Sequence, residues 1–210
     1  MNNTELIFWN VDTQFDFVSP EGKLCVEGAE LLKSKWKNLT VLAEKNSIRV
    51  VNTADFHFDD SAELSTKPDF IKTFPPHCMA NTVGADYIPE TIPTNPVVFD
   101  WYKKYNVADL LDSKEIRNIV IRKDAFDVFK GNPFTEAILK ILSPKIVVVY
   151  GVTTNVCVND AVVGLASRVE TVYVVEDAIK ELPNIPLPFE NWRELGVKMI
   201  QLSDVKKLLK

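Results

Sequence analysis

Cys157 is the residue whose surroundings in the sequence most favour chemistry. It follows the apolar run 146–150, Ile-Val-Val-Val-Tyr, which is typical of a strand buried on both faces of a parallel sheet. Gly151 is predicted to end this strand, and residues 153–155 are of types that cap helices, so we expect a helix to begin beside Cys157. The N–H groups and partial positive charge of a helix N-terminus favour a thiolate and an oxyanion. Cys157 is thus a candidate nucleophile, and a small buried hydrophobic side chain is the alternative.

Both histidines of the chain lie in one region, and a carboxylate accompanies the first. Asp55 and His57 are two residues apart, so on an extended segment their side chains point to the same side. His77 follows in a long, proline-containing loop region. Two histidines and one carboxylate can bind a divalent metal ion and leave coordination positions open. The short Asp-x-His pattern fits a turn cap and two ordinary histidines equally well. An alternative metal site that uses Cys78, next to His77, is disfavoured, because Cys78 would point away from His77 on an extended chain.

Two further charged residues follow buried-looking segments. Residues 5–11 lead into Asp12, and residues 118–122 lead into Lys123. Ligand chemistry in open parallel sheets gathers at the carboxyl ends of the strands, where Asp55 is also expected. Taken alone, Asp12 is better explained by a turn cap, and Lys123 by a solvated surface charge.

The composition predicts one domain over residues 1–210. Of the 210 residues, 46% are hydrophobic and 25% charged, which is enough apolar material for one sizeable core. The net charge of -5 argues against a nucleic-acid-binding surface. Because we find neither an export signal nor a membrane-spanning apolar run, we expect a cytoplasmic protein. Cys25, Cys78 and Cys157 are an odd, sparse set that fits a reducing compartment.

Strand-like and helix-like segments alternate along the chain. Six strands are expected, at 5–11, 48–54, 118–122, 146–150, 171–176 and 197–202, the last at an edge of the sheet. A helix is expected within 28–45, and a short β-like piece at 95–101 lies outside the count of six. This alternation predicts an α/β fold: a three-layer, doubly wound, six-stranded, mostly parallel sheet with helices on both faces.

Several motifs together resemble a known family. They are Asp12-Thr-Gln-Phe-Asp-Phe17, Asp55-Phe-His57, Phe74-Pro-Pro-His77-Cys78, Gly84-Ala85, Lys123 and Gly-Val-Thr-Thr-Asn-Val-Cys157. In this order, and across nearly the whole chain, they are similar to the isochorismatase-like cysteine hydrolases, most of all to the nicotinamidase/pyrazinamidase branch.

The resemblance implies roles for named residues. Asp12, Lys123 and Cys157 would form a catalytic triad. Asp55, His57 and His77 would bind one divalent ion, Zn, Mn or Fe. The Val152–Thr153 peptide would be cis, and the N–H groups of Thr153 and Cys157 would form the oxyanion hole. Phe17 and Phe74 match positions whose rings enclose a pyridine.

The sequence also departs from this branch. Phe74 stands where Trp is usual, Lys123 is not followed by the common Gly, and the Thr-Asn-Val before Cys157 resembles the broader amidohydrolases. An alternative substrate is therefore a small carbamoyl or ureide amide, or isochorismate. The complete metal trio favours nicotinamidase, an enzyme of NAD metabolism and pyridine nucleotide salvage.

A mechanism follows from these roles. Asp12 would take the thiol proton of Cys157 and pass it to the leaving ammonia, provided that burial raises its pKa. Lys123 would favour the thiolate by lowering the thiol pKa, and a thioester on Cys157 would then be hydrolysed. The expected partner is a small-molecule amide, with neither nucleic acid nor a membrane.

Two other classes of protein remain open. One is a metal-dependent hydrolase in which Cys157 is structural, and the other is an inactive binding protein. The sequence leaves open whether the chain forms a homo-oligomer, and what residues 183–188, a proline-rich stretch, contribute.

Overall fold

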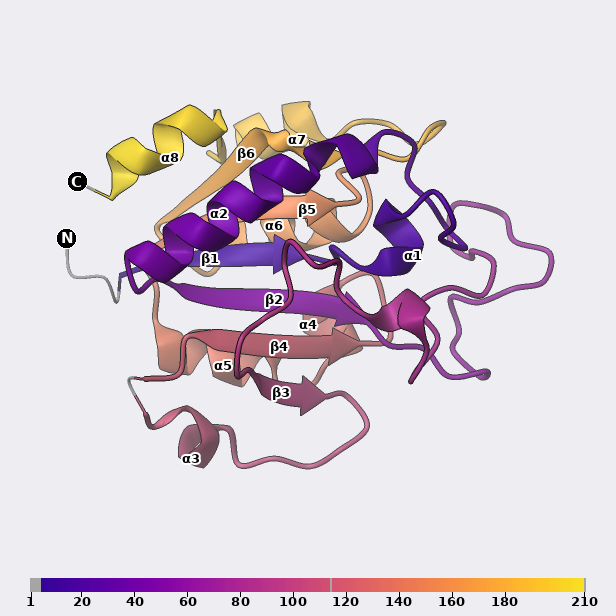
Figure 1. Cartoon of the computed structure of the whole chain (residues 1–210), viewed down its shortest axis with the longest axis horizontal. Coiled ribbons are helices and arrows are strands. Elements are labelled where there is room, and N and C mark those ends of the chain that lie inside the picture. Colours follow the sequence, from indigo (N-terminus) through magenta and orange to yellow (C-terminus); the bar gives the residue numbers. More distant parts are fainter. Residues whose placement is uncertain (1–4, 114, 210) are drawn as a thin grey trace.

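The computed structural model describes residues 5–113 and 115–209, and a parallel sheet organises them (Figure 1). The strands are β1 (Leu6–Val11), β2 (Arg49–Asp55), β3 (Val97–Asp100), β4 (Asn118–Lys123), β5 (Ile146–Val152), β6 (Thr171–Lys180) and β7 (Lys198–Ile200). Their order is β3-β4-β2-β1-β5-β6-β7, and each neighbouring pair is parallel. The chain therefore winds outward from β1 in two directions, with a switch point between β1 and β5.

The helices connect these strands. They are α1 (Phe15–Val18), α2 (Lys33–Lys45), α3 (Val107–Leu111), α4 (Val128–Gly131), α5 (Thr135–Leu142), α6 (Cys157–Ala166), α7 (Phe189–Glu194) and α8 (Leu202–Leu208), with short 3-10 turns η1 (Ala29–Leu32) and η2 (Val83–Ala85). Among the described residues, none of these helices is both long and apolar enough to cross a membrane.

The prediction of six strands was wrong, because the sheet has seven. The additional strand is β3, which falls within the β-like piece at 95–101 and pairs in parallel with β4 at the edge of the sheet. It is only four residues long, and its first two residues are half-buried. An edge strand pairs on one side only, so its sequence carries a weak signal.

Alternate residues of each central strand belong to two separate cores. In β1, Ile7 and Trp9 pack in one cluster with residues of α5 and α6, whereas Leu6 and Phe8 pack in a second cluster with residues of α2 and α8. In Figure 1, α2 crosses in front of the sheet while α5 and α6 lie behind it. Both faces of the sheet are therefore covered, which explains the nearly unbroken apolar runs of the central strands.

Gly151 does not end β5, contrary to the expectation from sequence. The strand continues to Val152, with a register irregularity opposite β6 between Val149 and Gly151. Gly151 has φ 124°, and a Cβ there would lie 2.0 Å from the carbonyl oxygen of Val11. Only glycine permits this close approach of β5 to β1, because any side chain would collide with the neighbouring backbone.

Candidate active site

Four predicted site residues meet at the carboxyl edge of the sheet. Asp12 follows β1, Asp55 and Lys123 end β2 and β4 as a register pair, and Cys157 begins α6 just after β5. These four strands are adjacent in the order β4-β2-β1-β5. Parallel strands bring their carboxyl ends to one edge, so residues far apart in the sequence converge at the switch point.

Lys123 is buried at the centre of this group, and its side chain is only 1% exposed. Its Nζ lies 3.0 Å from Asp12 Oδ2, donates a short hydrogen bond to Asp55 Oδ1, and lies 3.7 Å from Cys157 Sγ. Burial alone would lower the pKa of Lys123, but the two carboxylates raise it well above the usual range. The alternative that Lys123 is a solvated surface charge is wrong, because its ammonium is enclosed by counter-charges.

Asp12 is fully buried and has a left-handed backbone conformation, with φ 47°. The hydroxyl of Thr53 donates a hydrogen bond of 2.5 Å to Asp12 Oδ1. Burial raises the pKa of Asp12, Lys123 opposes this shift, and Asp55 adds to it. The direction is the one that a general base working near neutral pH requires.

Cys157 is the first residue of α6, as the sequence predicts, but its environment does not favour a thiolate. Burial raises the pKa of the thiol well above its usual range, Lys123 lowers it, and Asp12 and Asp55 raise it further. Burial therefore outweighs the charge of Lys123, and the direction of the shift is opposite to the lowering of the Cys157 pKa expected from sequence.

The helix also lacks the side-chain cap expected from residues 153–155. The N-cap of α6 is Val156, without a side-chain hydrogen bond. Asn155 instead holds the segment after β6, because its amide donates to the carbonyl oxygens of Leu182 and Ile185 at 2.8 and 2.9 Å. The proline-rich stretch is thus attached beside the site through a residue predicted to cap a helix.

The turn before Cys157 has the peptide geometry that the resemblance implied. The Val152–Thr153 peptide is cis. The carbonyl oxygen of Thr153 accepts hydrogen bonds from the N–H groups of Val156 and Val158, at 3.1 and 3.0 Å. The N–H groups of Thr153 and Cys157 stay predicted oxyanion donors.

Asp55, His57 and His77 form a compact, buried trio with ligand atoms within 4.8 Å of one another. Asp55 Oδ2 lies 3.8 Å from His57 Nε2 and 3.7 Å from His77 Nε2. Among the described residues, neither Asp55 Oδ2 nor His57 Nε2 has a hydrogen-bond partner. Unpaired buried polar atoms are costly, so two that face each other beside His77 fit a bound cation.

A second group of possible ligands needs no metal ion. Asp12, Asp55 and Cys157 also bring their ligand atoms within 4.8 Å of one another. The Lys123 ammonium contacts all three, and it therefore already supplies the positive charge there. Asp55 belongs to both groups, with Oδ1 toward Lys123 and Oδ2 toward the histidines.

A narrow pocket opens between the triad and the trio. Its walls include both predicted aromatic residues, and the full lining is Phe17, Leu24, Asp55, Phe74, His77, Phe126, Thr153, Val156, Cys157 and Leu182. The rings of Phe17 and Phe74 lie 5.3 and 6.4 Å from that of His77. The cavity volume is about 10 Å³, room for little more than the centre of one water molecule. An aromatic substrate can enter only if these side chains move apart.

Besides Leu24 of the pocket lining, four residues at the site were not identified from the sequence. Phe126 and Leu182 line the pocket, Asp124 contacts His57, and Glu63 Oε1 accepts the N–H of Phe126 at 2.7 Å. Glu63 Oε2 is buried and, within the described residues, has no hydrogen-bond partner. Burial and the Asp55 charge raise the pKa of Glu63 to about 7. None of these four lies in a motif, so only their position in space identifies them.

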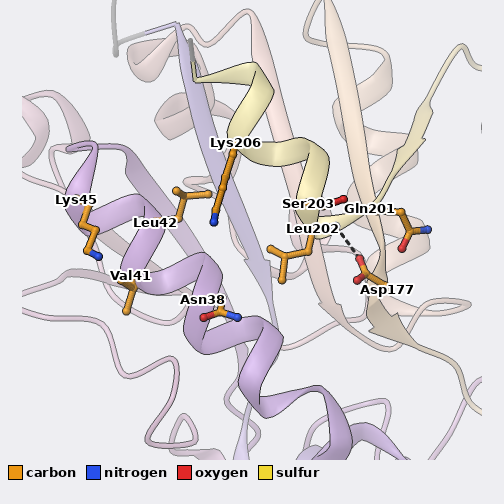
Figure 2. Close-up of a pocket in the computed structure, with 9 residues that line it drawn as sticks. All are labelled: Asn38, Val41, Leu42, Lys45, Asp177, Gln201, Leu202, Ser203 and Lys206. Atoms are coloured by element: carbon orange, nitrogen blue, oxygen red, sulfur yellow. Dashed lines mark hydrogen bonds between the residues drawn. The ribbon is translucent and has the colours of Figure 1, made fainter.

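A surface groove of much greater volume lies elsewhere. It measures about 670 Å³ and runs between α2 and α8 (Figure 2). Its lining residues are Asn38, Val41, Leu42, Lys45, Asp177, Gln201, Leu202, Ser203 and Lys206, none of which is a predicted site residue.

Comparison with known proteins gives a partial match to one family. Residues 103–195, a little under half of the chain, match the family model described as the Isochorismatase domain. The matched segment contains Lys123 and Cys157, whereas Asp12 and the metal trio precede it.

One curated relative is similar to part of the chain. The nicotinamidase/pyrazinamidase of Mycobacterium tuberculosis (strain ATCC 25618 / H37Rv) is 34% identical over 93 residues, 44% of this chain and 48% of the relative. The match thus spans about half the length of that relative.

Two solved structures share the fold over nearly their whole length. An isochorismatase family protein from Desulfovibrio vulgaris subsp. vulgaris str. Hildenborough has a TM-score of 0.75 at 20% identity, covering 98% of each chain. The pyrazinamidase of Pyrococcus horikoshii in complex with zinc has a TM-score of 0.70 at 23% identity, covering 94% of this chain and 99% of its own. At these identities the likeness supports the fold alone.

Proposed function

We propose that this protein is a metal-containing cysteine amidohydrolase, and that it hydrolyses nicotinamide to nicotinate and ammonia. The observation that carries the proposal is the position of Lys123 Nζ, which bonds Asp55, pairs with Asp12 at 3.0 Å and lies 3.7 Å from Cys157 Sγ. The similarity to a nicotinamidase/pyrazinamidase supports the substrate class. Such a reaction would belong to pyridine nucleotide salvage.

The acylation step begins from a neutral thiol. As Sγ of Cys157 attacks the amide carbon, Asp12 takes the thiol proton, and the N–H groups of Thr153 and Cys157 receive the developing oxyanion. The C–N bond then breaks, Asp12 delivers the proton to the leaving nitrogen, and ammonia departs. A thioester on Cys157 remains. The raised pKa of Asp12 suits this transfer, because the carboxylate is a stronger base than usual.

Deacylation reverses the roles. A water molecule attacks the thioester carbon while Asp12 accepts its proton, and the C–S bond breaks as that proton returns to Sγ. Lys123 keeps Asp12 oriented in both steps through their ion pair.

Asp55, His57 and His77 would hold a divalent ion, Zn, Mn or Fe. A bound ion would supply a Lewis acid that can orient a pyridine nitrogen, directly or through water. The zinc of the Pyrococcus horikoshii pyrazinamidase supports zinc as a candidate.

A small carbamoyl or ureide amide is the second candidate substrate. The narrow pocket favours it, because a cavity of about 10 Å³ must widen less for a small amide than for a pyridine ring. The two candidates share the triad chemistry and differ in their need for the metal.

The test is ammonia release from nicotinamide, pyrazinamide and N-carbamoyl compounds, with and without chelator, alongside isochorismate turnover. Nicotinamide and pyrazinamide should be preferred, and their hydrolysis should weaken after chelation. Cys157→Ala is the matched control for contaminating activity. Preference for a carbamoyl compound that is insensitive to chelation would replace the nicotinamidase proposal with the second candidate.

A further inference from the structure

We infer that Asp124 is a positioning residue for the metal ion, acting through His57. This inference rests on the metal site proposed above. Asp124 Oδ1 lies 2.8 Å from His57 Nδ1, and no sequence motif pointed to this contact. Asp124 directly follows Lys123, so the end of β4 places a lysine in the triad and the next residue places a carboxylate beside His57.

The contact fixes which nitrogen of His57 faces the metal position. A carboxylate accepts hydrogen bonds, so Nδ1 of His57 carries the proton that points to Asp124. Nε2 then faces Asp55 Oδ2 at 3.8 Å, and within the described part of the chain it has no hydrogen-bond partner. Asp124 therefore orients the ring and strengthens Nε2 as a ligand.

Asp124 is itself held in place from two sides. Ser61 Oγ donates a short hydrogen bond to the same Oδ1 and accepts the N–H of Phe58 at 3.2 Å. The backbone N–H of Asp124 donates to the carbonyl oxygen of Gly131 at 3.2 Å. The carboxylate thus joins the segment after His57 to the turn after β4.

His77 provides an internal contrast. Its Nδ1 donates to the backbone carbonyl oxygen of Pro75 at 2.8 Å, so main chain sets the orientation of its ring. His57 instead depends on a side chain, which mutation can remove. The two histidines should therefore respond differently to changes around them.

The test measures Zn²⁺ affinity of the metal-stripped full chain by competition with a chromophoric chelator. Asp124→Ala should weaken binding by about 10- to 100-fold. Asp124→Asn keeps an acceptor oxygen but loses its charge, so a smaller loss is expected. The control is Asp127→Asn, because Asp127 lies on the same turn with the same side-chain exposure, 21%, and pairs with Lys130 rather than a histidine. It should leave the affinity unchanged.

Two further measurements separate positioning from simple stabilisation. Ser61→Ala removes the other hydrogen bond to Asp124 but leaves the His57 contact, so it should reduce affinity less than Asp124→Ala. Thermal unfolding of each metal-free variant reports the structural cost, and Asp124→Asn carries the test if Asp124→Ala does not fold.

The outcomes distinguish the two proposals. If wild type binds Zn²⁺, His57→Ala does not, and the foldable Asp124 variants bind as wild type does, the role of Asp124 is overturned and the metal site stands. If wild type itself fails to bind Zn²⁺, both fall together.

Discussion

The two halves of the candidate site share Asp55 but differ in how their charges are satisfied. In the triad half, the ammonium of Lys123 contacts Asp12, Asp55 and Cys157, so the carboxylates find their counter-charge within the protein. In the metal half, Asp55 Oδ2 and His57 Nε2 face each other without a hydrogen-bond partner among the described residues. The first half therefore has its counter-charges within the protein, whereas the second would gain positive charge from the ion that we propose.

This difference explains why one carboxylate can serve both halves. Asp55 would be hard to bury without counter-charges, but Lys123, His57 and His77 together overcome burial and hold its pKa well below the usual range. Asp55 is therefore an anion, with one oxygen committed to Lys123 and the other available to a metal. A mutation in one half should therefore impair that half and leave the other largely intact.

Removing the nucleophile should have the largest effect. Cys157→Ala should lower amide hydrolysis by at least about 10³-fold, because the thioester cannot form. The fold should survive, since the change deletes one sulfur atom and leaves the rest of the turn in place. Ammonia release and thermal unfolding measure the two effects. Activity close to that of wild type would assign catalysis to the metal half alone.

Lys123→Met should damage the triad half next most severely. It keeps the long apolar stem and deletes the charge, which removes the counter-charge of Asp12 and one of those around Asp55, at a cost of about 3–5 kcal/mol. The Cys157 thiol, whose pKa burial already raises, should have a still higher pKa without this ammonium. The pH dependence of haloacetamide alkylation, read by mass spectrometry with Cys25 and Cys78 as internal controls, measures the shift.

An unchanged Cys157 alkylation profile would contradict an electrostatic role for Lys123. In wild type, the midpoint should lie above the ordinary value of about 8.5 in the metal-free protein. A midpoint well below that value would contradict the raised pKa of the Cys157 thiol.

His57→Ala should affect the metal half and spare the triad. Purified wild type should carry about one divalent ion per chain, and the variant should lose it. The Michaelis constant for a pyridine amide should rise, whereas the Cys157 alkylation profile should change little. Elemental analysis and steady-state kinetics provide the readouts. If wild type is metal-free and fully active on nicotinamide, the metal half has no catalytic task.

Glu63 offers the smallest and most local test. Burial and Asp55 raise its pKa from 4.5 to about 7, so in this range the folded state holds a proton that the unfolded chain has released. Glu63 therefore contributes to the free energy of unfolding below pH 4.5, and this contribution is lost as the pH rises through about 7. Urea unfolding of metal-free protein across this range should show the decline, and Glu63→Gln should reduce it. The exposed Glu194→Gln should leave the slope unchanged.

Much of the site could be predicted from the sequence, because the end of a buried strand can be recognised from a short stretch of residues. Apolar runs ending in Asp12, Asp55 and Lys123 identify strand ends, and parallel pairing brings such ends to one edge. The start of α6 at Cys157 and the compactness of the metal trio agree with the prediction for the same reason.

Other features depended on tertiary contacts that no pattern carries. The seventh strand is short and lies at an edge, and Asn155, a capping type, holds Leu182 and Ile185 instead of the helix. Asp124 and Phe126 lie outside the motifs and matter only through what they contact.

The sequence by itself therefore determined which reactive groups the protein has and to which edge of the sheet they belong. Only the tertiary structure decided the directions of their pKa shifts, because burial and the sum of nearby charges act through space. A lysine beside a cysteine predicts a lowered thiol pKa, but burial, together with two carboxylates around the same ammonium, raises the pKa of Cys157 instead. That balance depends on distances between four separate strands, and no single stretch of sequence contains it.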